Sequence, residues 1–164
     1  MTIPGQSDTA TGTGPGSAGA RPFASAPGDG DRIDIGTATF LVRASADSTG
    51  GALTILEEEP PLLDTSRHVH RAMDETFYVL DGEYEFVCGD ETFRLGPGGV
   101  AFLPRGIPHA HRRLIPGAGR LMCITTPGGF EGFFRTLAEA ALSGEPAESV
   151  YRRASQEHGV EWLG

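Results

Sequence analysis

The sequence has few cysteines and no long apolar run, and both shortages bear on where the protein works. No apolar stretch approaches the ~20 residues that a membrane helix needs, and the N-terminus lacks the basic segment followed by an apolar one that marks a secretion signal. Cys88 and Cys123 lie inside apolar, strand-like runs, the usual setting of free thiols in a reducing compartment. A single disulfide between them is the alternative. We therefore expect a cytoplasmic protein that does not bind membranes.

Basic residues are also scarce. Asp and Glu outnumber Lys and Arg by 22 to 13, which gives a formal net charge of −9 and repels polyanions at long range unless a basic patch overrides the repulsion. The two adjacent arginine pairs, at 112–113 and 152–153, are isolated and typical of solvated surface. We expect no nucleic-acid partner. The 164 residues, 38% of them hydrophobic, suffice for one globular domain with its own core.

Composition divides the chain into three segments. Residues 1–30 consist mainly of Gly, Ala, Ser, Thr and Pro and cannot bury enough apolar surface to offset their ordering entropy, so we predict a disordered tail. Residues 31–127 hold short runs rich in Val, Ile, Phe, Tyr and Thr, separated by Gly, Pro and Asp every 8–12 residues or so, which predicts an all-β sandwich or barrel. In residues 128–164 the apolar period becomes helical, and Pro146 and Gly159 bound a second helix. We predict that this C-terminal helical pair packs on the barrel or across a subunit boundary.

Two histidines and a glutamate lie close together in the middle of the β region. His68 and His70 are two residues apart, so in a strand they point to the same face at a separation of about 6.5–7 Å, from which two imidazoles can converge on one ion. Glu75 follows after a short loop and is placed to close on them from the adjacent strand. Such a set binds divalent first-row metals and leaves positions open for substrate. The alternative is an edge strand with ordinary surface residues.

A second stretch completes this pattern, and together the two resemble the motifs of the cupin family. The first motif, His-x-His, four residues, Glu, six residues, Gly, falls on His68, His70, Glu75 and Gly82. The second, Gly, five residues, Pro-x-Gly, two residues, His, falls on Gly98, Pro104, Gly106 and His109. The resemblance implies a small antiparallel jelly-roll barrel with one divalent metal per chain, Fe, Mn, Ni, Co or Zn, held by His68, His70, Glu75 and His109. Leu62 and Arg113 depart from the motifs at positions that are not ligands.

Strand alternation predicts the surroundings of this site. An apolar substrate pocket is expected from Phe77, Val79, Tyr84, Phe86 and Phe102, with plain core packing as the alternative. His111 shares the face of His109 and is a candidate catalytic residue together with Glu75, as a general base, a partner that orients a ligand, or a spare ligand. A solvent-exposed histidine at the rim is the alternative. Tyr78 and Leu80 should face outward, and an exposed apolar sheet face favours a homodimer.

The resemblance extends along the chain to bacterial quercetin-dioxygenase-like cupins, which also carry a C-terminal helical pair. It implies an oxygenase that uses O₂ on an aromatic, flavonol-like or polyketide-like small molecule. One alternative is a zinc-dependent polyketide cyclase or isomerase that needs no O₂, because zinc acts only as a Lewis acid. Another is a non-catalytic small-molecule-binding module. The intact ligand set with open coordination positions speaks against the last, and the sequence names neither the metal nor the substrate.

Overall fold

The computed structural model describes residues 20–59, 64–117, 119–143 and 145–163. Its β-strands form two sheets in which every described pair is antiparallel. The six-stranded sheet contains, in spatial order, β1 (Asp31–Asp34), β2 (Thr39–Ala44), β3 (Thr54–Glu59), β10 (Arg120–Thr126), β5 (Asp74–Asp81) and β8 (Val100–Leu103). The five-stranded sheet contains β11 (Val160–Trp162), β4 (His68–His70), β9 (His109–Arg113), β6 (Tyr84–Cys88) and β7 (Glu91–Leu95). The predicted antiparallel barrel is confirmed.

The core lies between the two sheets because alternate residues of each strand point inward. In β5 the inward residues Phe77 and Val79 are 4% and 0% exposed, whereas Tyr78 between them is 40% exposed. Burying each large apolar side chain stabilises the fold by roughly 1.5–3 kcal/mol. Cys88 and Cys123 are also buried and are free thiols, as predicted.

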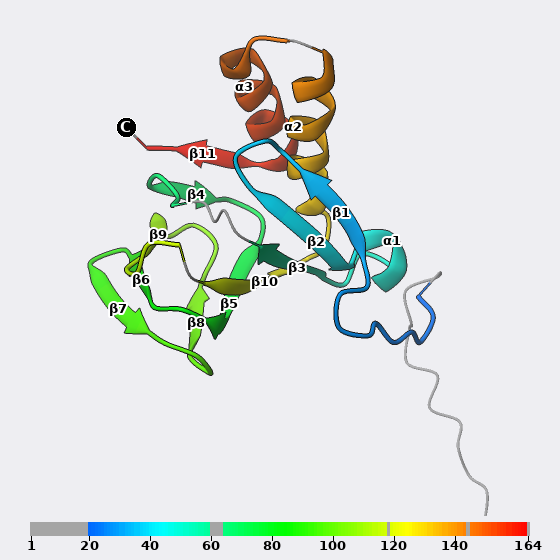
Figure 1. Cartoon of the computed structure of the whole chain (residues 1–164). Helices are drawn as coiled ribbons and strands as arrows, with labels where there is room; N and C mark the ends of the chain where they lie inside the picture. Colours follow the sequence, from blue (N-terminus) through cyan, green and yellow to red (C-terminus); the bar gives the residue numbers. More distant parts are fainter. Residues whose placement is uncertain (1–19, 60–63, 118, 144, 164) are drawn as a thin grey trace, which may run out of the picture.

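Two helices follow the barrel, where the sequence predicts them. They are α2 (Glu131–Ser143) and α3 (Ala147–His158), which ends at Gly159 in the left-handed conformation with φ 67°. They pack against each other, α2 contacts β1, and Figure 1 shows both beside β11 at the end of the molecule away from β7 and β8. Phe133, Phe134 and Leu137 on the predicted apolar face of α2 are buried, and the ring of Phe134 lies 3.8 Å, centroid to centroid, from that of Phe40 on β2.

Three short elements were not expected from the sequence: β1, the four-residue helix α1 (Ala46–Thr49) capped by Ser45, and β11. The last differs most from the prediction, because residues 128–164 were expected to be helical. Instead the chain turns after α3 and adds β11 to the edge of β4, pairing Val160 with His70 and Trp162 with His68. The C-terminus therefore contributes to the barrel itself.

The N-terminal segment has no helix or strand before Asp31 among its described residues. Residues 1–19 of the predicted tail lie outside the described residues. The part nearest the barrel does touch it, since the Arg43 guanidinium donates to the carbonyl oxygens of Ser25 and Ala26 at 3.2 and 2.7 Å. None of the helices in the described ranges is both long and apolar enough to cross a membrane.

Candidate metal centre and cavity

Four side chains from three strands, two of the five-stranded sheet and one of the six-stranded sheet, converge inside the barrel. Strand β4 supplies His68 and His70, β5 supplies Glu75 and β9 supplies His109. His68 and His109 are directly opposed in the β4–β9 ladder, which brings their rings to 4.6 Å between centroids. One ligand atom from each of the four residues lies within 4.8 Å of the other three, and all four residues are buried. The structure therefore brings together the four predicted ligands.

Hydrogen bonds to the backbone set the direction in which the imidazoles face. His68 Nδ1 lies 2.8 Å from the Ser66 carbonyl oxygen, and His109 Nδ1 lies 2.9 Å from that of Ile107. A carbonyl oxygen only accepts, so each Nδ1 carries a hydrogen and each Nε2 is left to serve the cluster. This is the usual way in which a protein orients a histidine ligand.

The donor set fits a bound cation. Glu75 places Oε2 3.1 Å from His109 Nε2 and Oε1 3.4 Å from His70 Nε2. At these distances the carboxylate accepts from an imidazole N–H, and a divalent cation that takes the place of the hydrogen would be shared by the same oxygen and nitrogen atoms. The two ring nitrogens of His70 are buried and make no hydrogen bond among the described residues, although such a burial is costly without a partner. Three imidazoles and one carboxylate suit first-row divalent metals.

The electrostatics favour the ligand forms of these groups. Burial lowers the pKa of His68 to about 4, so its imidazole is neutral at pH 7. Burial acts to raise the pKa of Glu75, but the neighbouring His109 and His70 hold this pKa well below its usual range. Glu75 is therefore the single anion of the cluster, beside neutral His68.

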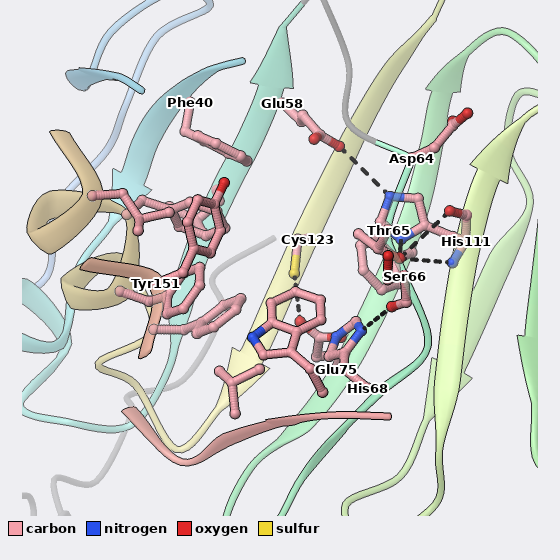
Figure 2. A pocket seen from close by; sticks show the side chains of 18 residues that line it. Phe40, Glu58, Asp64, Thr65, Ser66, His68, Glu75, His111, Cys123 and Tyr151 are labelled. Carbon is pink, nitrogen blue, oxygen red and sulfur yellow. Dashed lines mark hydrogen bonds and ion pairs between the residues drawn. The ribbon is translucent and has the colours of Figure 1, made fainter. Parts of the chain in front are cut away.

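A cavity of about 450 Å³ opens onto this cluster, with His68 and Glu75 in its wall. The rest of the lining is mostly apolar and comes from both the barrel and the C-terminal elements. Figure 2 shows Phe40 and Tyr151 on one side of the cavity, and Cys123 between Glu58 and Glu75. The wall on the helical side includes Phe130, Phe133, Phe134, Leu137, Tyr151 and Trp162.

The predicted pocket residues fall in three places. Phe77 lines the cavity, as expected. Val79, Tyr84 and Phe86 are at most 1% exposed and belong to the packed core behind it rather than to its lining. The prediction for Phe102 is wrong: this side chain is 59% exposed on the outer face of β8. The pairing of Leu103 with Glu75 turns Leu103 inward, so strand alternation turns Phe102 outward.

His111 faces the cavity, as predicted, and two polar neighbours of this histidine were missed. Its Nε2 lies 3.9 Å from Glu58 Oε2, and its Nδ1 lies 3.4 Å from Thr65 Oγ1. Glu58 sits in an acidic run, 57–59, that looks solvent-exposed in the sequence. Alternation from the buried Leu56 was the available signal, because it places Glu58 on the inner face of β3.

Two facing antiparallel sheets with a buried three-histidine, one-glutamate cluster between them define a barrel of the jelly-roll class with a candidate metal centre. The chain carries a cupin domain of this class, because residues 56–125 match the family model described as Cupin domain. The resemblance seen in the two sequence motifs is thus confirmed.

Comparison with individual proteins agrees with the match to the cupin domain. The chain is 31% identical, over 122 residues, to quercetin 2,3-dioxygenase of Bacillus subtilis (strain 168), and the match covers 74% of this chain and 36% of that protein. The chain thus spans about a third of this relative. Among solved structures, KdgF from Halomonas sp. matches with a TM-score of 0.53 and 20% identity over 62% of this chain and 90% of its own. An RmlC-like cupin from Shewanella frigidimarina NCIMB 400 matches with a TM-score of 0.53 and 19% identity over 66% of this chain and 93% of its own. These two structures show the fold alone.

Proposed function

We propose that this protein is a metal-dependent oxygenase that acts on an aromatic, flavonol-like or polyketide-like small molecule. The observation that carries the proposal is the opening of the ligand cluster onto a cavity lined by aromatic side chains. The relationship to a quercetin 2,3-dioxygenase supports it. A cavity of about 450 Å³ lies within the range of small-molecule sites.

The chain supplies four ligands, and a divalent ion that favours five or six keeps one or two positions for other molecules. A redox-active metal bound there supplies coordination sites for a chelating substrate and for O₂. The protein residues do the rest: Phe77 and the aromatic wall exclude water and hold a planar ligand, and Glu75 offsets part of the metal's charge. Glu75 and His111 are the two groups proposed to act on the substrate, since both line the cavity.

The test is metal analysis followed by oxygen uptake. The protein is purified without air, reloaded separately with Fe(II), Mn(II), Ni(II), Co(II) or Zn(II), and assayed with an oxygen electrode against flavonols, catechols and polyketide-type enols. We expect O₂ consumption with at least one redox-active metal and none with Zn(II). The variant His109→Ala serves as the control. It removes one member of the cluster, and His109 itself does not line the cavity, so the variant should lose the metal while the cavity wall stays intact.

Two other results would move the assignment. Turnover with Zn(II) in the absence of O₂ would make the protein a metal-dependent cyclase or isomerase. Binding of the panel without any turnover would make it a non-catalytic binding module. One set of metal-loaded samples distinguishes these two alternatives from an oxygenase, because binding, turnover and O₂ consumption are measured separately on it.

We also propose a homodimer in a reducing, cytoplasmic setting. The outer face of the six-stranded sheet exposes Tyr78, Val100 and Phe102 at 40%, 57% and 59%, and Tyr78 pairs directly with Val100. An apolar sheet face of this kind suits contact with another molecule. Light scattering after size-exclusion chromatography measures the mass in solution, and Phe102→Glu with Val100→Glu should convert a dimer to monomers.

A further inference from the structure

Besides the four-residue cluster, the cavity holds a pair of buried polar side chains that face each other. Glu58 on β3 and His111 on β9 are only 5% and 7% exposed, and both line the cavity. These strands belong to opposite sheets, so the two side chains face each other across the interior. Figure 2 shows this pair at one end of the cavity and Glu75 with His68 at the other.

The distance between the two polar groups follows from strand geometry. His109 belongs to the metal cluster, and His111 is the next inward residue of the same strand, about 6.5–7 Å further along. Phe77 contributes an aromatic surface beside the pair, because its ring lies 4.9 Å from that of His111 and lines the cavity. A ligand that spans the cavity therefore meets a metal at one end, an aromatic surface in the middle and Glu58 with His111 at the other end.

The geometry of the pair suits a hydroxyl group. The 3.9 Å between His111 Nε2 and Glu58 Oε2 exceeds a direct hydrogen bond, but one oxygen atom can lie within hydrogen-bond distance of both. Thr65 Oγ1 accepts from the His111 backbone N–H at 2.9 Å, and its one hydrogen has two acceptors at 3.4 Å, the His111 carbonyl oxygen and Nδ1. Donation to Nδ1 leaves that nitrogen without a hydrogen of its own. In that arrangement Nε2 carries the ring hydrogen. A hydroxyl then accepts from His111 and donates to Glu58, which a ketone or an ether cannot do.

We propose that Glu58 and His111 form a hydroxyl-binding subsite, which selects aromatic ligands that carry a hydroxyl beyond the oxygens that reach the metal. The proposal rests on the proposed function, since the other end of the ligand is at the metal. It narrows the substrate class from aromatic molecules in general to hydroxylated ones. Glu58 and His111 act here as specificity-determining residues.

The experiment compares matched probes on the zinc-loaded, full-length protein, where no oxidation interferes. The probes are catechols with a 4-hydroxyalkyl chain of one to three carbons and the corresponding 4-alkylcatechols, titrated by isothermal calorimetry. In the wild type the terminal hydroxyl should tighten binding about tenfold or more for at least one chain length, the scale of hydrogen bonds to a charged group. In Glu58→Met and in His111→Phe this gain should disappear, and Glu58→Gln should keep only part of it.

The control variant is Glu59→Gln, which removes a carboxylate from the same strand on the opposite face, where it pairs with the exposed Arg32. It should keep the full hydroxyl gain. Equal binding of hydroxyalkyl and alkyl probes to the wild type would overturn the subsite and leave the proposed function standing. If no catechol binds the zinc-loaded protein at all, the proposed function fails and the subsite fails with it. Melting curves establish that each variant is folded before it is titrated.

Discussion

The indole ring of Trp162 lies against the imidazole of His68, with 4.9 Å between ring centroids and a tilt of 41°. Its Nε1 donates to Ser155 Oγ on α3 at 2.8 Å, and β11 pairs Trp162 with His68 across the ladder. The strand β11 thus holds an aromatic wall of the cavity directly beside a predicted metal ligand. Trp162 is also the only tryptophan in the sequence, so its fluorescence reports on this place alone.

Binding of a paramagnetic metal should therefore quench the tryptophan fluorescence. We expect titration of the chelator-treated protein with Co(II) or Cu(II) to quench most of the emission and to saturate at about one equivalent. Zn(II), which is diamagnetic, should compete with Co(II) and restore emission. The variant His109→Ala keeps Trp162 and His68 and serves as the matched control, with weak and unsaturated quenching. Equal quenching in a His68→Ala/His70→Ala double variant would contradict the placement of the site.

Metal content gives a second, independent prediction. Elemental analysis of the purified protein should find about one divalent ion per chain, and His68→Ala, His70→Ala and His109→Ala should each lower that occupancy sharply. The reason is that each imidazole is one of the four groups that make up the cluster. The control is His158→Ala on α3, outside the cluster, which should retain full occupancy. Full metal content in the His68/His70 double variant would exclude this centre.

The burial of His68 predicts that the metal-free protein loses stability as the pH falls. The unfolded chain protonates this histidine below about pH 6.5, whereas burial keeps the folded one neutral down to about pH 4. Between these values the unfolded state binds more protons, so the free energy of unfolding rises with pH, by up to about 1.4 kcal/mol per pH unit. Chemical denaturation of chelator-treated protein from pH 4.5 to 7 measures the slope. His68→Gln should flatten it, and a slope that is equal in the two proteins would argue against the buried neutral form.

The sequence predicted the barrel and the metal ligands because both depend on local spacing. Alternation along β4 and β9 places His68, His70 and His109 on inner faces, and the short loop before Glu75 carries the chain to β5, which lies in the facing sheet rather than beside β4 as predicted. Strand periodicity and the short loop group His68, His70 and Glu75, whereas His109 was predicted from the resemblance to the cupin motifs.

The missed features depend on contacts between distant parts of the chain. β11 has only three residues, too few to show a period, and its partner β4 lies some ninety residues earlier, so nothing local marks Trp162 as part of the cavity. Phe102 was placed on the wrong face because only its register against β5 decides the direction of the strand. Glu58 was overlooked because a buried glutamate is rare unless a partner such as His111 is brought to it by folding.

Neither cysteine should react with alkylating reagents in the folded protein. Burial, followed by the charges of Glu75 and Glu58, raises the pKa of the Cys123 thiol well above its usual range, and its Sγ lies 3.7 Å from Glu75 Oε1. Burial also raises the pKa of Cys88. Because the thiolate is the reactive form, iodoacetamide at pH 8 should leave the native protein unmodified and label both cysteines in urea. Mass spectrometry counts the labels, and rapid native labelling of Cys123 would show that the cavity wall opens at this position.

The last prediction concerns Glu75 and separates an oxygenase from a binding module. Glu75 is the anion of the cluster, so it lowers the net charge of a bound metal and tunes both its redox potential and the basicity of a bound substrate. Glu75→Gln keeps the shape and removes the charge. For an oxygenase we expect turnover to fall about 100-fold or more, the scale of a lost acid or base group, while the substrate still binds.

His111→Ala provides the comparison, because His111 lines the same cavity without being one of the four ligands. Its loss should cost less, about 10–100-fold, as is typical of residues that support a metal site from outside the ligand set. Stopped-flow oxygen consumption and equilibrium substrate binding, measured on metal-matched samples, separate the two effects. A wild-type protein that consumes O₂ at a rate unchanged by Glu75→Gln would refute this role. In a binding module, no substrate yields O₂ consumption and Glu75→Gln changes affinity alone.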